Sequence, residues 1–368
     1  MQHLTQARLT RMSSALPDIG QKPMIWKRSG VKKQLTETMM AIFKKLTSVA
    51  ACVLGTGLFA PSSNAGAAAY PDKPVTIYVG FAAGGPTDVV ARLLAEGLTH
   101  KFRQSFVIEN RPGASGELAA NLLKKATPDG YTLMIGANGT LSILPAVRKT
   151  IQYQPLRDFV PIAPVARFPY YLAVSKESTF STYDDLVKYG RSHAKGLTFG
   201  SAGPGSANHL AGEWFAKATG MDAVHIPYKG DAAALTDLIA NRVDFAFLAG
   251  SVVIPQVEAE KIRLIASASS SPDIGLQEIP VLGRDELPGF TAEPWNGLLG
   301  PAGLPSDIVQ ILNAAVNEVM TSPNIKERLK KLDQYPFTGS VDVFADHIRK
   351  QSAQTADLVK TLNLTIEQ

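Results

Sequence analysis

Short segments with apolar residues at every second position alternate along the chain with segments in which apolar residues recur at helical spacing. The first kind predicts strands and the second predicts helices. Val75, Ile77 and Val79 alternate with polar neighbours and predict a strand, whereas the apolar residues after Pro86 recur at helical spacing. Further strands are predicted at Phe106–Glu109, Tyr131–Ile135, Phe159–Arg167, Tyr170–Val174, Leu197–Phe199, Val224–Pro227, Val243–Leu248 and Ile262–Ala266. Further helices are predicted at Glu117–Lys125, Thr182–His193, Ala207–Thr219, Ala232–Ala240, Ser306–Met320, Pro323–Leu332 and Val341–Leu362. This alternation predicts an α/β fold with parallel sheets.

Two glycine-rich turns each lie between a predicted strand and a predicted helix. The first, within Val79–Arg92, turns at Gly84–Gly85 and enters its helix at Pro86, which suits a first helical position. The second, Gly200–His209, enters its helix through Ser206, a good N-cap residue. A helix N-terminus presents backbone N–H groups with a partial positive charge, so each turn predicts a cradle for an anion. We expect the two turns to face each other.

The basic residues are concentrated at the N-terminus, which changes the meaning of the net charge of +5. Residues 1–65 hold nine of the 37 Lys and Arg residues and two of the 32 Asp and Glu residues. The remainder therefore has 28 basic and 30 acidic residues and a net charge of −2. Nucleic-acid binding needs clustered cations on the folded part, so the sequence predicts no nucleic-acid partner.

Residues 1–67 are predicted to be a leader with a secretory signal peptide. Lys44–Lys45 precede the apolar run Leu46–Ala60, and small residues then suit cleavage after Ala65 or Ala67. The apolar run is shorter than the about 20 residues that a membrane-spanning helix needs. The length of the polar segment before it indicates that translation begins at Met39 or Met40.

Cys52 is the one cysteine of the chain and ends a sequence, VAAC, that resembles a lipobox. A lipid anchor at Cys52 is therefore the alternative to cleavage near Ala65. After cleavage the mature chain holds no cysteine, which excludes disulfides, thiolate catalysis and cysteine metal ligands.

The glycine turns lack the patterns of nucleotide-binding and catalytic sites. No lysine follows Gly85 until Lys101, and Asn208 stands where a dinucleotide-binding turn has its third glycine. The sequence also contains no G-x-S-x-G elbow and no H-x-x-x-H pair. It therefore predicts a protein that is not an enzyme, with no cofactor, metal site or catalytic residue.

The sequence suggests individual roles for four side chains near the turns. Asp88 either complements the dipole of its helix or accepts a hydrogen bond from a ligand ammonium or hydroxyl group. His209 either packs in the first helical turn or acts as a base. Tyr228 either belongs to a simple turn or supplies a phenol to a cleft, and Asp231 is predicted to cap the helix that follows it.

Eight ordered blocks from Tyr70 onward closely resemble the periplasmic substrate-binding proteins of tripartite tricarboxylate transporters, the Bug-type receptors. The blocks are YPDKPVTIYVGFAAGGPTDVVAR, IENRPGASGELAA, DGYTL, YQPLRDFVP, GSAGPGSANHLAGE, HIPYKG, LIANRVDF and WNGLLGPAGLP. The resemblance implies a type II periplasmic-binding-protein fold, in which two α/β lobes enclose a cleft for a small carboxylate. On this chain we expect residues 68–168 and 291–368 in lobe 1 and residues 169–290 in lobe 2. Closure is predicted to hinge at Arg167–Tyr170 and Glu293–Trp295.

The resemblance also implies the residues that hold the ligand. One carboxylate is expected on Phe81–Asp88 and Ser201–Ser206, often through ordered water, and residues in Asn138–Ser142 and after Leu248 vary with the ligand. The candidate ligand-binding residues are Phe81, Ala83, Gly84, Gly85, Thr87, Asp88, Asn138, Thr140, Ser142, Ser201, Ala202, Gly203, Gly205, Ser206, Tyr228 and Ser251. The uncharged segment Ala249–Ser251 disfavours a ligand with a second strongly charged end.

The sequence therefore predicts a monomeric solute receptor that captures a small carboxylate and delivers it to integral membrane transporter subunits. A ligand-sensing partner of a membrane histidine kinase is the alternative with the same fold. A secreted hydrolase or lyase that uses Asp88 or His209 is a third hypothesis, which lacks a visible pair of base and nucleophile.

Overall fold

A computed structural model describes residues 70–193, 196–270, 276 and 279–365. The predictions that concern residues 1–67, including the start at Met39 or Met40 and the anchor at Cys52, lie outside these residues. Within the described ranges, no helix combines the length and apolar character needed to cross a membrane.

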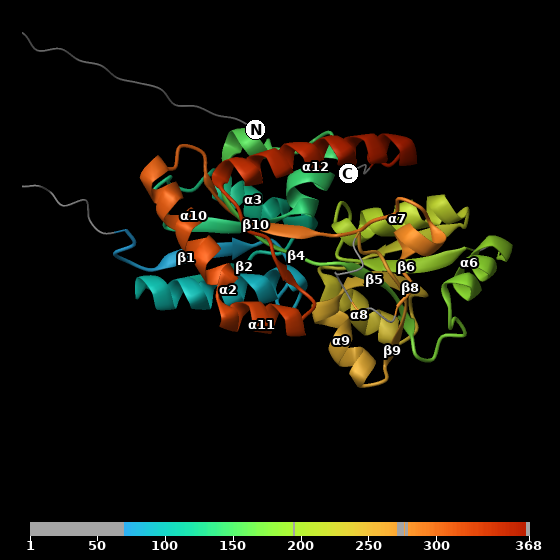
Figure 1. Ribbon diagram of the computed structural model, residues 1–368. Helices are drawn as coiled ribbons and strands as arrows, with labels where there is room; N and C mark the ends of the chain where they lie inside the picture. Colours follow the sequence, from blue (N-terminus) through green and yellow to red (C-terminus); the bar gives the residue numbers. More distant parts are fainter. Residues whose placement is uncertain (1–69, 194–195, 271–275, 277–278, 366–368) are drawn as a thin grey trace, which may run out of the picture. The chain divides into compact units, whose positions relative to one another are not determined.

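Two mixed sheets organise the fold, one at the left and one at the right of Figure 1. Sheet A has the strand order β11-β4-β10-β3-β1-β2, and sheet B has the order β7-β6-β8-β5-β9. The strands of sheet A are β1 (Val75–Val79), β2 (Phe106–Asn110), β3 (Thr132–Ala137), β4 (Phe159–Arg167), β10 (Trp295–Pro301) and β11 (Tyr335–Pro336). Those of sheet B are β5 (Tyr170–Ser175), β6 (Leu197–Ser201), β7 (Ala223–Pro227), β8 (Phe245–Ala249) and β9 (Ile262–Ser267).

Helices cover both faces of each sheet. The α-helices are α2 (Pro86–Phe102), α3 (Glu117–Lys124), α4 (Leu144–Val147), α5 (Pro155–Asp158), α6 (Tyr183–Ser192), α7 (Ala207–Thr219), α8 (Asp231–Ile239), α9 (Gly250–Glu258), α10 (Ser306–Thr321), α11 (Pro323–Lys331) and α12 (Val341–Leu362). Short 3₁₀ or π turns lie at η1 (Ala114–Gly116), η2 (Gly139–Ile143) and η3 (Leu282–Glu286). In sheet A, α2, α10 and α11 pack on one face, and α3 and α12 pack on the other (Figure 1).

Each sheet buries apolar side chains on both faces, which explains the long apolar runs of its central strands. In sheet B, Leu172 of β5 belongs to the core under α6 and α7, whereas Tyr171 belongs to the core under α8 and α9. Because neighbouring residues of a strand point to opposite faces, two separate cores form on either side of one sheet.

Local sequence explains where several helices begin and end. Thr182 and Asp185 form a capping box at the start of α6, and the Ser206 hydroxyl accepts the His209 N–H at the start of α7. Helix α7 ends at Gly220, which has φ = 65°, a conformation that favours glycine.

The chain crosses between the two sheets at adjacent places. Strand β4 of sheet A ends at Arg167 and β5 of sheet B begins at Tyr170, and the return segment runs beside them. The Phe168 N–H donates to the Pro294 carbonyl at 3.1 Å, and the Tyr170 N–H donates to the Ala292 carbonyl at 3.0 Å. The hinge prediction at Arg167–Tyr170 and Glu293–Trp295 thus falls where the two crossings pair, and these bounds stay a proposal.

The expectation of parallel sheets holds for only part of each sheet. Strands β1, β2 and β3 pair in parallel, but β10 runs antiparallel to both β3 and β4, and β5 runs antiparallel to both β8 and β9. Every antiparallel pair among the described strands involves β4, β5 or β10, the strands at which the chain crosses between the sheets.

The loop predicted at Asn138–Ser142 is a π-helical turn, η2. Its conformation is fixed by distant partners: the Thr140 hydroxyl donates to the Ser115 carbonyl at 2.7 Å, and the Tyr153 hydroxyl donates to the Thr140 carbonyl at 2.6 Å. Neither contact is visible as a local pattern in the sequence.

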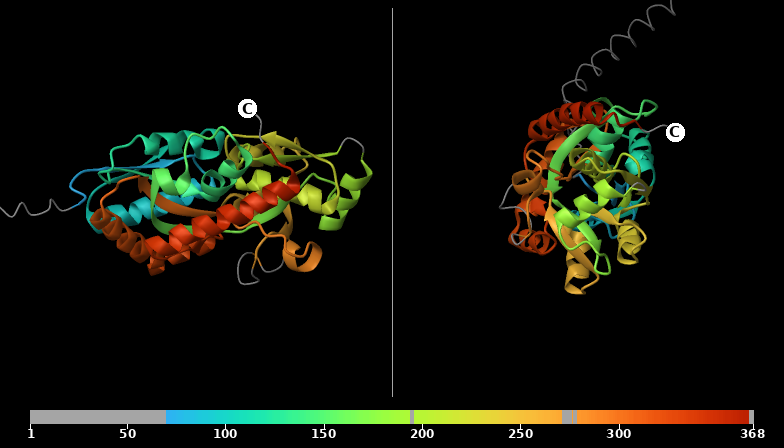
Figure 2. Two further views of the ribbon diagram at one scale, coloured as in Figure 1. Left: turned by 90° about the horizontal axis from the view of Figure 1, so that it is seen from above. Right: turned by 90° about the vertical axis from the view of Figure 1, so that its right-hand side faces the viewer.

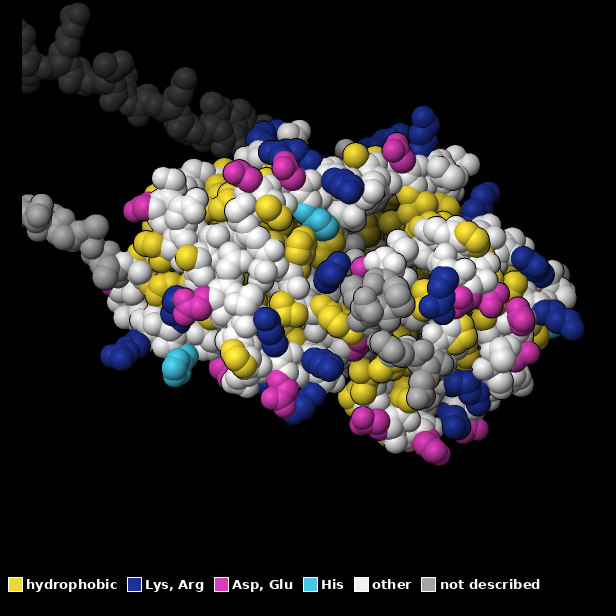
Figure 3. Space-filling view, viewed as in Figure 1, with side chains coloured by type: hydrophobic (Ala, Val, Ile, Leu, Met, Phe, Trp, Pro, Cys, Tyr) yellow, Lys and Arg dark blue, Asp and Glu magenta, His cyan; other side chains and the backbone are white. Residues whose placement is uncertain are grey.

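A groove of about 710 Å³ separates α12 from α7. Figure 3 shows the surface hollowed there, with apolar side chains at its floor. In the view from above, α12 runs obliquely and ends near α7 (Figure 2, left). Asn138, Ala207 and Pro294 line this groove and also the smaller cavity described below, so the two spaces adjoin.

Candidate functional site

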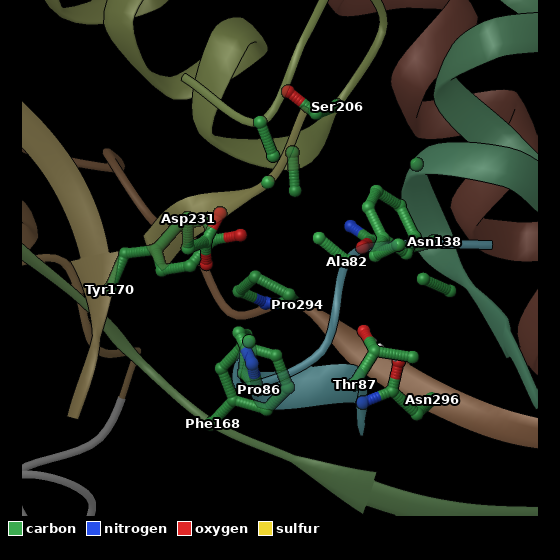
Figure 4. A pocket seen from close by; sticks show the side chains of 17 residues that line it. Ala82, Pro86, Thr87, Asn138, Phe168, Tyr170, Ser206, Asp231, Pro294 and Asn296 are labelled. Atoms are coloured by element: carbon green, nitrogen blue, oxygen red, sulfur yellow. Dashed lines mark hydrogen bonds between the residues drawn. The ribbon is translucent and has the colours of Figure 1, made fainter. Parts of the chain in front are cut away.

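A cavity lies where the turn after β1, the start of η2 and the turns before α7 and α8 converge (Figure 4). Its volume is about 30 Å³, room for about two water molecules. The residues that line it are Phe81, Ala82, Gly85, Pro86, Thr87, Ala137, Asn138, Gly139, Phe168, Tyr170, Ala202, Ser206, Ala207, Gly230, Asp231, Pro294 and Asn296. They come from elements of both sheets and from both crossings. A carboxylic acid of four or more carbons is larger than this cavity, which adjoins the groove between α7 and α12.

The first wall of the cavity is the N-terminus of α2. Gly85 is its N-cap residue, and Pro86 is its first helical residue. The Gly84 N–H donates to Asp88 Oδ2 at 3.0 Å, which closes the turn. The first N–H groups of a helix have no partner within the helix, so this wall presents donors to the cavity.

The facing wall is the N-terminus of α7. Hydrogen bonds within the second glycine turn hold this N-terminus in place. Gly203 has φ = 116°, a conformation that favours glycine. The Ser206 hydroxyl donates to the Gly203 carbonyl at 2.5 Å, and the Gly205 N–H donates to His209 Nδ1 at 3.2 Å. His209 is thereby an acceptor that supports the turn, which is the packing role rather than that of a base.

A second histidine, His225, contacts the same turn through Ser201. His225 Nε2 lies 2.5 Å from the Ser201 hydroxyl, and its ring centroid lies 4.0 Å from that of His209. Burial and the neighbouring His209 lower the pKa of His225 to about 3. His225 is therefore neutral at physiological pH.

Asp231 brings a carboxyl group to the cavity wall at the start of α8. The sequence predicted it as the cap of the following helix, but the N-cap residue is Gly230, and Asp231 is the first helical residue. Its Oδ1 accepts a 2.9 Å hydrogen bond from Asn208 Nδ2. Burial raises the pKa of Asp231 to about 7, against the opposing effect of this hydrogen bond.

Asn296 of β10 lies at the other side of the cavity (Figure 4). Its Oδ1 accepts a 3.2 Å hydrogen bond from the Thr87 hydroxyl, which fixes the amide against the start of α2. Its Nδ2 is buried and has no acceptor among the described residues. The amide therefore offers a hydrogen-bond donor to the cavity.

The structure brings six of the sequence-predicted site residues to this cavity. They come from both glycine turns and from the turn after β3, and they are Phe81, Gly85, Thr87, Asn138, Ala202 and Ser206. Their role in ligand binding stays a proposal.

The other predicted residues lie around the cavity without lining it. Ala83 and Gly84 are exposed, Gly203 and Gly205 shape the second turn, and the Ser201 hydroxyl contacts His225. Asp88 is buried against Arg92 and Asn110, with Nε and Nδ2 donors at 2.9 Å and 2.8 Å, which matches the structural interpretation of this acid.

Four further hydroxyl groups among the predicted residues have protein partners. Thr140 donates to the Ser115 carbonyl, and the Tyr228 hydroxyl donates to Asp237 Oδ2 at 2.7 Å. Ser142 accepts from Ser352 at 3.3 Å, and Ser251 accepts from Gln334 Nε2 at 3.2 Å. These contacts support the walls rather than the interior of the cavity.

Ala82, Pro86 and Gly139 line the cavity and lie in the segments Phe81–Asp88 and Asn138–Ser142 that were expected at the ligand, although they were not named singly. Sequence reasoning missed the other lining residues, which are Ala137, Phe168, Tyr170, Ala207, Gly230, Asp231, Pro294 and Asn296. Phe168, Tyr170 and Pro294 lie in the segments that were predicted as hinges and not as walls, whereas Asn296 lies in β10. Asp231 follows the YKG turn directly, so its position after a glycine turn and before a helix was a usable signal.

Metal-ligating side chains are not gathered at this cavity. Within the ranges that the structure describes, no three or more His, Cys, Asp and Glu side chains are placed to hold one metal ion.

The chain matches known proteins over most of its length. Residues 90–364 match the model of the tripartite tricarboxylate transporter family receptor. The UPF0065 protein in the tcbD-tcbE intergenic region of Pseudomonas sp. strain P51 is 32% identical over 82% of this chain and 89% of that protein. Protein BugT of Bordetella pertussis is 28% identical over 87% of this chain and 98% of that protein.

Solved structures share the fold. R. palustris Rpa4515 with adipate is 34% identical with a TM-score of 0.78, and the match covers 80% of this chain and 99% of that one. MatC (Rpa3494) from Rhodopseudomonas palustris with bound malate is 31% identical with a TM-score of 0.75, covering 79% of this chain and 100% of that one. The resemblance drawn from the sequence blocks and the expectation of an α/β fold with two lobes are both confirmed.

Proposed function

The chain belongs to the tripartite tricarboxylate transporter receptor family, and we propose that it is a periplasmic receptor that captures a small carboxylate and delivers it to a membrane transporter. Relatives that were solved with adipate and malate support the ligand class. Membership of this family supports a membrane transporter as the recipient and the periplasm as the location.

The observation that carries this proposal is the convergence of two helix N-termini on one cavity. Helix α2 approaches from sheet A with Gly85 and Pro86, and α7 approaches from sheet B with Ser206 and Ala207. Amide N–H groups and the positive ends of two helix dipoles act together on an anion placed between them. An acid that binds both turns favours the closed arrangement, because it contacts both walls only when they meet.

A thermal-shift measurement on the purified mature protein tests the capture of carboxylates. A ligand at about 100 times its Kd adds about 2.7 kcal/mol to the free energy of unfolding and raises Tm by several degrees. A panel of mono-, di- and tricarboxylates in which no member raises Tm would overturn the proposal. Uncharged amides of the same size are the matched control and are expected to give no shift.

Uptake in a deletion strain tests delivery. Loss of uptake of the bound acid supports a transport receptor. Retained uptake with lost induction of the transport genes supports instead the sensing role with a histidine kinase.

A further inference from the structure

Asp231 is the one charged side chain among the described residues that line the cavity. It is 4% exposed, and its carboxyl group points into the space between the two glycine turns (Figure 4). Its Oδ2 is buried, and no donor in the described part of the chain lies within hydrogen-bond distance of it. Burying a carboxyl oxygen without a hydrogen-bond partner lowers the stability of the fold. Its position at the cavity therefore indicates that a bound ligand supplies the missing partner.

The orientation of Asp231 is fixed by a hydrogen-bonded chain from the second glycine turn. The Ala202 N–H donates to Asn208 Oδ1 at 3.1 Å, and Ser206 Oγ lies 2.7 Å from the same oxygen. Asn208 Nδ2 then donates to Asp231 Oδ1 at 2.9 Å, and Asn208 is itself fully buried. One carboxyl oxygen is thus held in place, and the other is left for the cavity.

The cavity is asymmetric in its hydrogen-bonding capacity. Asn296 Nδ2 at one side is a buried donor with no acceptor among the described residues, and Asp231 Oδ2 at the other side is a buried acceptor. The described lining contains no lysine, arginine or histidine, so a cationic group on the ligand is what would supply a counter-charge to ionised Asp231.

We propose that Asp231 selects the ligand, with its free Oδ2 paired to an ammonium group on the captured acid. The receptor then prefers amino carboxylates to unsubstituted carboxylates with the same carbon chain. This inference rests on the proposed function, since it assumes that the two glycine turns hold the carboxylate end. The uncharged segment Ala249–Ser251 had disfavoured a ligand with a second strongly charged end. The inference differs from that expectation, because Asp231 of α8 provides a charged group for such an end.

The protonation state of Asp231 gives the pairing a definite pH dependence. Burial raises the pKa of this carboxyl to about 7, so it is ionised above neutral pH and mostly protonated near pH 5. Tyr170 of β5 is the titratable group whose charge is coupled to Asp231, and burial keeps its pKa well above its ordinary value. Tyr170 therefore stays neutral over this range, and Asn208 of α7 carries no charge.

Isothermal titration of the mature protein with matched pairs of acids tests the proposal. The pairs are aspartate with succinate and 4-aminobutanoate with butanoate. We expect the amino member of at least one pair to bind at least about tenfold more tightly at about pH 8. Its affinity should fall by roughly 30-fold at about pH 5.5, because a carboxyl group with a pKa of about 7 is then only about 3% ionised.

Variants separate charge pairing from general damage. Asp231→Asn and Asp231→Ser should remove the preference within a pair and flatten its pH dependence, whereas Asp184→Asn on the exposed side of α6 should change neither. The serine variant keeps a small polar group at the start of α8 and serves if the asparagine variant does not fold.

Two results overturn the inference while the proposed function stands. One is unsubstituted acids binding as tightly as their amino partners. The other is affinity for dicarboxylates rising toward low pH, which would mean that protonated Asp231 donates to a second carboxylate. Absence of binding by every acid of both pairs and of the wider panel would instead overturn the proposed function.

Discussion

The Ser115 hydroxyl donates a 2.6 Å hydrogen bond to the Pro204 carbonyl, which joins the 3₁₀ turn η1 beside sheet A to the second glycine turn beside sheet B. Ser115 is buried and adopts a left-handed conformation with φ = 52°. Next to this contact, a Cβ atom on Gly139 would lie 3.4 Å from the Gly205 carbonyl oxygen. The two walls are therefore joined by a direct hydrogen bond, and the absence of a Cβ on Gly139 lets the two turns approach closely.

Ser115→Ala removes the hydrogen bond that joins the two turns. Because that bond exists only when the walls meet, we expect carboxylate affinity to fall by about 2- to 10-fold, which corresponds to about 0.5–1.5 kcal/mol. Isothermal titration measures the change. Ser105→Ala, at an exposed position, is the matched control. Equal affinities of wild type and Ser115→Ala would show that this contact does not stabilise the closed state.

Gly85→Leu should abolish binding while it leaves the fold intact. Gly85 has φ = −80°, which any residue adopts, and the nearest atom to an added Cβ is the Ala82 carbonyl oxygen at 3.7 Å. The leucine side chain would occupy the cavity of about 30 Å³, so we expect affinity to fall by at least about tenfold. Circular dichroism and Tm check that the variant folds, and wild-type affinity in a folded variant would contradict the assignment of this turn.

Tyr171→Phe should lower the free energy of unfolding by about 1–3 kcal/mol, because a buried carboxyl loses a donor. The Tyr171 hydroxyl of β5 donates to Asp333 Oδ2 at 2.5 Å and accepts the Leu276 N–H at 2.8 Å. Urea denaturation measures the loss. Tyr228→Phe also removes a hydroxyl that donates to an aspartate, but at a more exposed pair, and should cost less. Equal costs for the two variants would argue against the importance of burial.

Stability should decrease as the pH falls from about 6.5 toward about 3, in part because of His225. The folded protein holds this histidine neutral with a pKa of about 3, while the unfolded chain takes up a proton near the ordinary value of 6.5. The unfolded state therefore binds more protons throughout this window, and acid favours it. The contribution is fully present above about pH 6.5.

The variant His225→Gln isolates this effect, because glutamine keeps a polar group beside Ser201 but does not titrate. Urea denaturation at several pH values should show a shallower fall in the free energy of unfolding than in wild type. The exposed His100→Gln is the control and should follow the wild-type curve. Parallel curves for wild type and His225→Gln would contradict the low pKa.

Elements with a strong local signal were predicted closely from the sequence. Helix α7 and helix α12 have the predicted bounds, Ala207–Thr219 and Val341–Leu362, because a serine cap precedes each apolar pattern. The family was also recognisable from the ordered blocks around the two glycine turns. These features depend on residues near each other in the chain, so the sequence carries them directly.

Elements fixed by distant partners were not predicted. The π-helical turn η2 depends on Ser115 and Tyr153, and the direction of β10 depends on which strands it meets when the chain returns. Asp231 shows the same limit at the site. Its position before a helix favoured a capping role, but Asn208, 23 residues earlier, holds its carboxyl at the cavity wall.

The sequence by itself determined two glycine turns at helix starts, the alternation of strands and helices, and the family. Only the tertiary structure decided that Asn296 and Asp231 share one cavity with these turns and that each has a free polar atom there. The reason is physical: backbone propensity and capping act over a few residues, whereas burial and hydrogen-bond satisfaction depend on what packing brings together.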